Sequence, residues 1–336
     1  MFQKALYILF SICLVTGVTI PSLAQVDPHF SQFYVYPLGL NPGLTGAVDA
    51  EYRVSAIYRN QWHEVTKAFS TTGLSADVNT NKNISLGANL FHQTAGSGGY
   101  QYINGYLTMA YTGIQLDAMG YKRIGMGLQA GIINRRFDPS KLQFGSQWLP
   151  GIGYQPSIPP NEVFDKTSSS AFDAGAGIAY YDGTPDQKIN LFGGFSTMHL
   201  TQPEDPFLNG VKEKLPVRYT VHAGAKVAVN EVLALVPNFI YMKQGTAQEK
   251  MVGGYAQLYL NRDADLMLGS NWRFQDAVTP FVGVYYKNTT IGVSYDMNIS
   301  PLGKSVKGTN SFELSVTFTG KKRERVDTRQ FMCPRL

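Results

Sequence analysis

Side chains that commonly carry out chemistry are few in this sequence and widely separated. There are five histidines and two cysteines: His29, His63, His92, His199, His222, Cys13 and Cys333. No HExxH, CxxC or nucleophile-elbow motif occurs, so none of these residues has the spacing of a metal site or a catalytic nucleophile. We therefore expect no enzyme activity, no catalytic residue, no metal site and no cofactor.

Two local patterns allow both a chemical and a structural interpretation. The stretch GAGIAYYDG, residues 175–183, has glycines like those of a phosphate-binding loop. It lacks the GxGxxG spacing and a following helix, which favours glycines within a strand. His63 and Glu64 are adjacent and could form an acid–base pair. Neighbouring side chains on a strand point to opposite faces, which favours a position at the end of a strand instead.

The N-terminus has the pattern of a secretory signal peptide. Lys4 precedes the apolar residues 5–18, and Ser22 and Ala24 are small residues before a predicted cleavage site between Ala24 and Gln25. An anchoring helix is the alternative, but the apolar run ends at Pro21, short of the ~20 residues that span a bilayer. We expect residues 1–24 to be removed during Sec-dependent export.

The composition differs from that of an ordinary soluble domain. Charged residues make up 16% of the chain, against a typical ~25%. The chain has 34 glycines, 20 tyrosines and 19 phenylalanines, and after cleavage Cys333 has no partner for an internal disulfide. Few charges, many aromatic residues and much glycine are typical of strands with lipid on one side and a polar interior on the other. The net charge of +5 arises partly from KKRER at 321–325, a tail rather than a folded basic face, so nucleic acid is not an expected partner.

Segments that alternate between apolar and polar residues recur along the chain, separated by turn residues. Most have 9 to 14 residues, which suits tilted membrane strands of ~9–11 residues better than soluble strands of ~5–6. They predict an all-β fold, a transmembrane antiparallel β-barrel of the outer membrane with about 14 strands over residues 52–320. The predicted strands are 52–62, 68–79, 83–94, 100–113, 122–135, 171–181, 188–199, 216–229, 232–243, 251–261, 264–274, 279–287, 289–298 and 311–320.

The alternation also predicts which face of each strand meets lipid. In 216–229, apolar residues from Val217 to Val229 occupy one face and polar residues such as Arg218 and His222 the other. His222 could titrate within the lumen or be one member of a polar lining. In 123–137, the face from Ile124 to Ile132 is predicted to contact lipid, with the glycine and Gln129 face turned inward.

The connections between these segments alternate in length. If the first strand runs outward, the periplasmic turns are short: 80–82, 114–121, 182–187, 230–231, 262–263 and Asn288. The outward loops then include the three longest, 136–170, 200–215 and 299–310, an asymmetry expected of outer-membrane barrels. The proline-containing loop 136–170 has two open interpretations, a disordered external loop and a gate or partner-binding surface.

Five short motifs follow one another along the chain, a DPxFSQ segment, an LNPxxxG segment, YRxQW, GxSYDxN and a terminal CPR. Their residues are Asp27, Pro28, Phe30, Ser31, Gln32, Leu40, Asn41, Pro42, Gly46, Tyr58, Arg59, Gln61, Trp62, Gly292, Ser294, Tyr295, Asp296, Asn298, Cys333, Pro334 and Arg335. The motifs and their order resemble those of the PorP/SprF family of type IX secretion system membrane proteins, found in Bacteroidetes. Gly43, Tyr36 and Leu336 depart from the family pattern.

The resemblance implies an outer-membrane barrel that assists export or surface attachment of cargo proteins, often gliding adhesins. It also implies contact with type IX machinery in the periplasm and outer membrane, and the barrel surface would contact outer-membrane lipid and lipopolysaccharide. Two alternatives are a FadL-like or porin-like barrel that passes a small solute and a soluble secreted β-protein. The strand lengths argue against the last.

The segments that flank the barrel have their own expected roles. Residues 25–51 carry turn initiators at Asp27–Pro28 and Asn41–Pro42 and several aromatic residues that need burial. A fourteen-strand lumen is wider than its own side chains fill, so this segment is either a plug or a periplasmic cap. The basic residues 321–336 are expected in the periplasm, either docked on a partner or solvated.

Overall fold

The computed structural model describes residues 27–62, 68–80, 83–96, 98–162, 164, 166–204, 214–301, 303, 306 and 309–320. The predicted signal peptide 1–24, the His63–Glu64 pair and the basic tail 321–336 with its Cys333–Arg335 motif lie outside the described residues.

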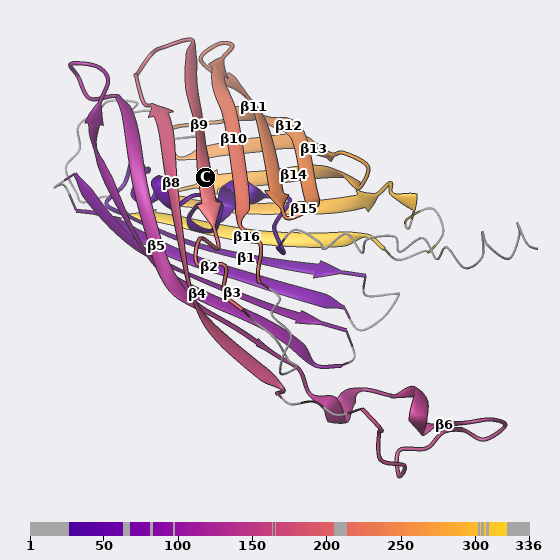
Figure 1. The fold of residues 1–336 in the computed structure, drawn as a ribbon. Coiled ribbons are helices and arrows are strands. Elements are labelled where there is room, and N and C mark those ends of the chain that lie inside the picture. The colour runs from indigo at the N-terminus through magenta and orange to yellow at the C-terminus, as the bar shows by residue number, and fades with distance from the viewer. Residues whose placement is uncertain are drawn as a thin grey trace, which may run out of the picture.

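Within the described residues, fourteen antiparallel strands form one closed barrel, which confirms the predicted fold (Figure 1). Each strand pairs with its neighbours in the chain, and the barrel closes where β1 pairs with β16. The strands are β1 (Tyr52–Gln61), β2 (Phe69–Asn79), β3 (Ile84–Ala95), β4 (Tyr100–Gln115), β5 (Lys122–Arg136), β8 (Ser168–Asp182), β9 (Ile189–Met198), β10 (Arg218–Ala228), β11 (Leu233–Gln244), β12 (Ala247–Tyr259), β13 (Ala264–Arg273), β14 (Ala277–Tyr286), β15 (Thr289–Asn298) and β16 (Ser311–Gly320).

Strand boundaries differ from the predicted ones most at β12, which begins at Ala247 rather than at residue 251. The reason is a tight hairpin after β11. Gly245 has φ +57, a conformation that glycine adopts without the strain of a Cβ atom. A loop of only Gly245 and Thr246 therefore joins the two strands.

The faces of the strands follow the predicted alternation. On β5, Met126, Leu128 and Ile132 are 51%, 60% and 61% exposed, whereas Gln129 is 5% exposed. On β10, Val221 is exposed and His222 is buried. An outward band of apolar side chains with polar side chains inside is the pattern of a barrel in lipid.

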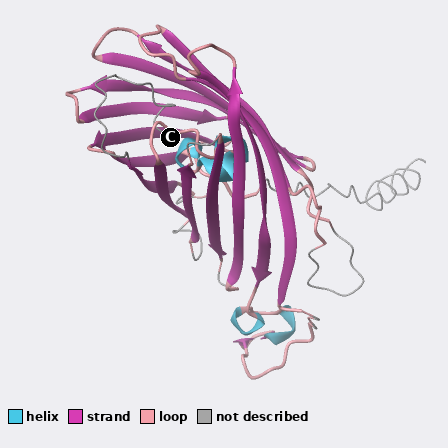
Figure 2. Cartoon of the chain, turned by 90° about the vertical axis from the view of Figure 1, so that its left-hand side faces the viewer, coloured by secondary structure: helices cyan, strands magenta, loops and turns pink. Residues whose placement is uncertain are grey.

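The two ends of the barrel differ in the length of their connections. At the short-turn end, the loops before β3, β5, β9, β11, β13 and β15 are tight. The long-loop end carries the connections 137–167, 199–217 and 299–310. The first of these contains η3 (Pro139–Lys141), η4 (Gly145–Gln147) and a small hairpin of β6 (Trp148–Leu149) and β7 (Gly153–Tyr154), and it projects beyond the barrel (Figure 2).

No helix among the described residues has the length and apolar character needed to cross a membrane.

Residues 27–47, which we call the lumenal segment, lie inside the barrel (Figures 1 and 2). The segment contains three short helical turns, η1 (Phe33–Val35), α2 (Pro37–Leu40) and η2 (Pro42–Leu44). Its apolar side chains are buried, and the Phe30 ring lies 5.7 Å from Tyr36 and 5.8 Å from Phe91 of β3. This burial supplies the apolar interior of a barrel whose own inward face is largely polar.

The lumenal segment runs along the length of the barrel. Asp27 contacts Gln244, the last residue of β11 at the long-loop end. Gly46 donates its N–H to Asp77 near the short-turn end. Residues 48–51 then connect the segment to β1, so the chain reverses direction before the first strand.

Candidate functional site

The lumenal segment is attached to the barrel wall by buried polar contacts, and three clusters carry most of them. The Asp296 cluster contains Ser31, Arg59, Arg273, Asp296 and Glu313. The Asp27 cluster contains Asp27, Asp173, His199, Arg218 and Gln244. The Asp77 cluster contains Leu44, Gly46, Arg53 and Asp77. A charged group buried without a partner is costly, so these pairings decide where the segment can lie.

In the Asp296 cluster, one carboxylate receives donors from four strands and from the segment. Asp296 accepts from Arg59 Nη2 at 2.8 Å, from Arg273 Nη2 at 3.0 Å and from Ser31 Oγ at 2.8 Å. Thr279 and Ser311 hydroxyls also donate to it, at 2.8 and 2.9 Å. The carboxylate is 2% exposed and fully partnered.

Glu313 of β16 holds the backbone of the segment. Its two carboxylate oxygens accept from the N–H groups of Ser31 at 2.7 Å and Gln32 at 2.9 Å. Arg59 Nη1 donates to the same carboxylate at 3.1 Å and to the carbonyl oxygen of His29 at 3.0 Å. The Gln32 amide is held in turn by Ser294 and Ser315. Such charge-assisted bonds to backbone groups fix both position and orientation.

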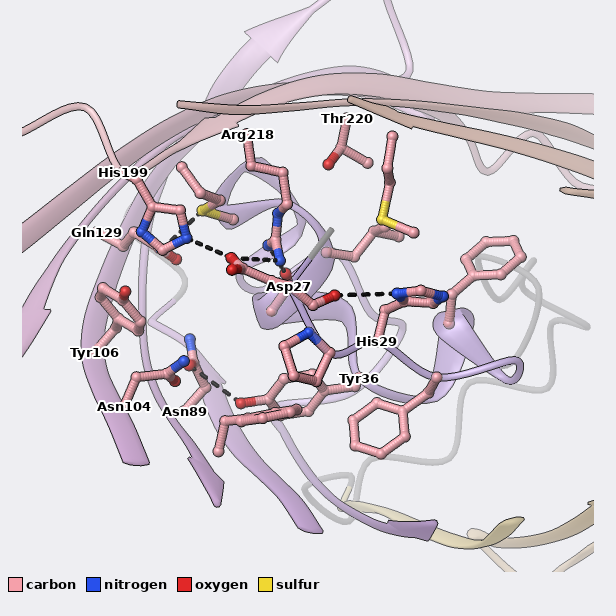
Figure 3. Close-up of a pocket in the computed structure, with 18 of the residues that line it drawn as sticks. Asp27, His29, Tyr36, Asn89, Asn104, Tyr106, Gln129, His199, Arg218 and Thr220 are labelled. Carbon is pink, nitrogen blue, oxygen red and sulfur yellow. Dashed lines mark hydrogen bonds and ion pairs between the residues drawn. The ribbon is translucent and has the colours of Figure 1, made fainter. Parts of the chain in front are cut away.

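In the Asp27 cluster, side chains from several parts of the barrel wall bind Asp27, the first described residue of the lumenal segment (Figure 3). Asp27 contacts His199 Nε2, and its Oδ2 accepts from Arg218 Nη1 at 3.3 Å. Gln244 accepts from the Asp27 N–H at 2.7 Å and donates to its carboxylate at 3.0 Å. On the other side, His199 Nδ1 lies 2.7 Å from Asp173.

The surroundings of His199 favour its charged form. Burial would lower the pKa of the imidazole, but the Asp27 and Asp173 carboxylates outweigh it and raise the pKa of His199 to about 9. For Asp27, burial works against ionisation, yet His199 and Arg218 hold the pKa of the carboxyl well below its usual range. A protonated histidine donates from both ring nitrogens, which matches its two carboxylate contacts.

The pH dependence of this cluster is a testable consequence. Because the pKa of His199 rises from 6.5 to about 9, its contribution to stability is complete below pH 6.5 and disappears as the pH rises through 9. His199→Gln should reduce the free energy of unfolding by up to roughly 2 kcal/mol at about pH 7.5 and by much less at about pH 10.5.

Denaturant unfolding of both proteins at the two pH values measures this difference. His92→Gln on β3 is the matched histidine control and should cause only a small loss of stability. An equal loss for His199→Gln at both pH values would contradict the charged pairing.

The middle of the segment lies directly against β5 and β8. The Asn41 amide donates to the Ile178 carbonyl at 3.0 Å and lies 3.1 Å from His222 Nε2, while its oxygen accepts from the Gly43 N–H at 2.8 Å. A Cβ atom on Gly127 would lie 2.1 Å from the Pro42 oxygen. The absence of a side chain at Gly127 is therefore what allows the backbone of the segment to approach β5.

At the short-turn end, the Asp77 cluster fixes the end of the segment. Arg53 makes a bidentate pair with Asp77, Nε and Nη2 each at 2.9 Å, and Nη2 donates to the Leu44 carbonyl at 3.2 Å. Gly46 donates its N–H to Asp77 at 2.7 Å and has φ +73. A side chain there would be strained and would also meet Ser85.

The family of the chain follows from its similarity to known proteins. The family model of the type IX secretion system membrane protein PorP/SprF matches residues 22–318. The chain belongs to the PorP/SprF family. Its membership and its barrel make it an outer-membrane protein of type IX secretion. A search of curated proteins found no match.

Two solved barrels are similar in fold. The toluene transporter TbuX of Ralstonia pickettii is 10% identical, with 83% of this chain and 91% of that chain covered and a TM-score of 0.47. A FadL homologue of Pseudomonas aeruginosa is 10% identical, with 83% and 92% covered and a TM-score of 0.47.

Most of the PorP/SprF motif residues fall within or beside the three clusters. The DPxFSQ residues Asp27, Ser31 and Gln32 bond to the barrel wall, Phe30 packs on Phe91, and Pro28 is half-buried beside Asp27. The Gln61 amide, oriented with its oxygen toward Arg59, accepts from Nη2 at 2.8 Å.

Other motif residues of the PorP/SprF family lie away from the clusters. Tyr58 and Tyr295 are 39% and 45% exposed on the outward face near the long-loop end, a position typical of the aromatic girdle of a membrane barrel. Trp62 packs edge-on against Phe69, with ring centroids 5.0 Å apart. Asn298 ends β15 and accepts from the Ser300 N–H at 2.9 Å.

Several residues of the clusters were missed by the sequence motifs. Asp77, His199, Arg273 and Glu313 are partners of motif residues, and Asp173 is the second partner of His199. Asp77, Asp173, Arg273 and Glu313 lie at inward positions of predicted strands. A charged side chain buried in a lumen requires a partner of opposite charge. The inward position of these charges could therefore have identified them as candidates from the sequence. Among the described residues, no group of three or more His, Cys, Asp or Glu side chains could hold a metal ion.

Proposed function

We propose that this chain is an accessory barrel of type IX secretion whose lumen is closed by the lumenal segment. In this role it assists export or surface attachment of a cargo protein, without a catalytic step. It reaches the outer membrane after Sec-dependent export. The observation that carries the proposal is that Ser31, Arg59 and Asp296, one residue each from the DPxFSQ, YRxQW and SYDxN motifs, meet in one buried polar cluster inside the barrel.

The energetic cost of this arrangement supports a permanent closure. Arg59, Arg273, Asp296 and Glu313 are each at most 4% exposed, and burying such charges is favourable only when every one is paired. A barrel that served only as an open passage would need neither these pairs nor the aromatic residues of the segment. The motif residues are therefore best explained as holding the segment in the lumen.

The two ends of the barrel offer different surfaces to partners. The loop 137–167 at the long-loop end carries a hairpin whose Trp148, Leu149 and Ile152 are 54%, 39% and 69% exposed. Exposed apolar residues on a protruding loop are typical of a protein contact. In this proposal the cargo contacts that loop, and the periplasmic machinery contacts the short-turn end and the basic tail.

A channel for a small solute is the second candidate function. The observation that favours it is a cavity between the lumenal segment and β3, β4, β5, β10 and β11, which is lined by aromatic side chains. A cavity within the lumen is a usual position for a transported ligand in a barrel.

The deciding experiment combines native-membrane affinity purification with planar-bilayer recording. The proposed role predicts a heat-modifiable outer-membrane species that brings down type IX machinery or a surface cargo and conducts no steady current. A species that is purified alone and conducts steadily would replace this role with solute transport.

The basic tail provides a further prediction. Deletion of residues 321–336 should lower the recovery of periplasmic machinery and reduce secretion, because KKRER supplies positive charge for an acidic partner surface. The abundance of the folded barrel should be unchanged, as measured by the intensity of the heat-modifiable band on a gel. A matched variant with Lys287→Gln and Arg262→Gln in short turns removes charge elsewhere at the same end of the barrel. Normal secretion by the tail deletion would show that the tail is only solvated.

A further inference from the structure

The outward face of the neighbouring strands β9 to β13 is almost free of charge (Figure 1). Among the outward positions that the structure describes on these strands, only Lys243 and Lys250 are charged, and both are exposed. Lys243 lies one residue before the end of β11, and Lys250 lies near the start of β12. The loop between these strands is at the long-loop end of the barrel, which faces the outside of the cell in barrels of this kind. Both lysines therefore lie at the outer leaflet of the membrane.

The strand register places the two lysines on one patch. Lys243 pairs with Gln248, and Lys250 lies two residues further along the same face of β12. Residues in this diagonal relation are about 7–8 Å apart, so the two long side chains reach the same small anion. Among the described residues, neither ammonium group has a carboxylate within ion-pair distance. The patch thus carries two positive charges without a counter-charge from the described part of the chain.

Aromatic side chains surround the lysine pair. Lys243 pairs on its other side with Tyr219 of β10, which is 46% exposed. The Lys250 Nζ atom lies 6.0 Å from the centre of the Tyr241 ring. Phe274, beyond the end of β13, donates its N–H to the Lys250 carbonyl at 3.0 Å and has an exposed ring. Aromatic residues of membrane barrels gather at the level of the lipid headgroups, so the ammonium groups lie at that level too.

The anion that suits this position is a lipid phosphate. A lysine on a lipid-facing surface extends its ammonium group toward the headgroups, where it finds water and phosphate. A phosphate monoester carries a charge of about −1.5 to −2 near neutral pH, which two ammonium groups balance. A phosphodiester carries a single charge and balances one of them. The phosphate monoesters of an outer leaflet belong to the lipid A part of lipopolysaccharide, whereas its phospholipids carry phosphodiesters.

We propose that Lys243 and Lys250 bind a phosphate group of lipopolysaccharide on the outer wall of the barrel. The rings of Tyr219, Tyr241 and Phe274 contact the sugar and acyl chains beside that phosphate. The site lies outside the lumen and does not depend on the secretion role proposed above.

Isothermal titration of the mature full-length protein in a non-ionic detergent tests the proposal. The probes are monophosphorylated lipid A, the same lipid with its phosphate removed, and phosphatidylglycerol, each in mixed micelles. The phosphorylated lipid A should bind at least about tenfold more tightly than the dephosphorylated form, as expected of two lysine contacts. Raising the salt concentration to about 1 M NaCl should remove most of this preference, because ions screen exposed charges.

Variants locate the binding on the patch. Lys243→Gln combined with Lys250→Gln should reduce binding of phosphorylated lipid A to the level of the dephosphorylated form, while the heat-modifiable band shows a folded barrel. Lys188→Gln combined with Lys287→Gln is the matched control, because it removes two exposed lysines at the short-turn end. The control should bind phosphorylated lipid A as the native protein does.

Three results would overturn the proposal. The first is equal binding of phosphorylated lipid A by the native protein and the Lys243→Gln, Lys250→Gln variant. The second is an equal loss of binding in the control variant, which would indicate a general effect of net charge. The third is tighter binding of phosphatidylglycerol than of lipid A, which would make a phospholipid the occupant of the patch.

Discussion

Replacing Arg59 by methionine is expected to lower the free energy of unfolding by about 3–5 kcal/mol. The methionine keeps much of the length of the arginine side chain but removes the charge. Glu313 would lose its arginine partner, and Asp296 would keep only Arg273 and the hydroxyl donors. A buried carboxylate without its counter-charge is strongly destabilising. Urea unfolding in detergent, followed by the loss of heat-modifiable mobility, measures the change.

The control for Arg59→Met is the same substitution at Arg262, which is exposed in a short turn. Arg262→Met should change the free energy of unfolding by less than about 0.5 kcal/mol. A small effect at Arg59 as well would contradict the view that the polar cluster holds the lumenal segment, because the cluster would then be dispensable.

Replacing Gly127 by valine is expected to displace the lumenal segment and open the barrel. The Cβ atom would lie 2.1 Å from the Pro42 oxygen, 2.2 Å from the Pro42 carbonyl carbon and 2.5 Å from the Gly43 nitrogen. All three are backbone atoms, so no side chain can rotate away, and the segment must leave β5. We expect a cost above the ~1–3 kcal/mol of ordinary overpacking. In planar bilayers the variant should show steady conductance, whereas the native protein, with its lumen closed as proposed, should show none.

Gly105→Val is the matched control for Gly127→Val. The nearest atom to a Cβ on Gly105 is Leu90 Cδ1 at 3.7 Å, an ordinary contact on the outward side of β4. That variant should remain closed and as stable as the native barrel. A closed, stable Gly127→Val protein would mean that the lumenal segment does not lie against β5.

The barrel could be predicted from the sequence because its signal is local. Lipid on one side and a polar lumen on the other impose an alternation that each strand carries by itself, as in Met126, Leu128 and Gln129 of β5. The exact ends of the strands depend on turn geometry. The two-residue loop at Gly245 extended β12 beyond its predicted start because a positive φ is not visible in a composition pattern.

The contacts of the candidate site could not be predicted in the same way, since they join distant parts of the chain. Arg59 and Asp296 are 237 positions apart, and Asp27 and His199 are 172 apart. The family resemblance identified Arg59, Asp296 and Asp27 as motif residues but not their pairings. Those pairings depend on the barrel's closure and on the path of the lumenal segment, which no local pattern encodes.

The position of the Asp296 cluster also has a consequence for biogenesis. Arg59 belongs to the first strand and Glu313 to the last, and these are the strands that meet when the barrel closes. The segment that fills the lumen comes before the first strand, yet its Ser31 and Gln32 backbone is bound by the last. A chain that ends before β16 therefore keeps Arg59 without Glu313, and the N–H groups of Ser31 and Gln32 without their carboxylate. The cluster thus distinguishes a finished barrel from an incomplete one, and the assembly pathway has to leave these groups unpaired until the final strand arrives.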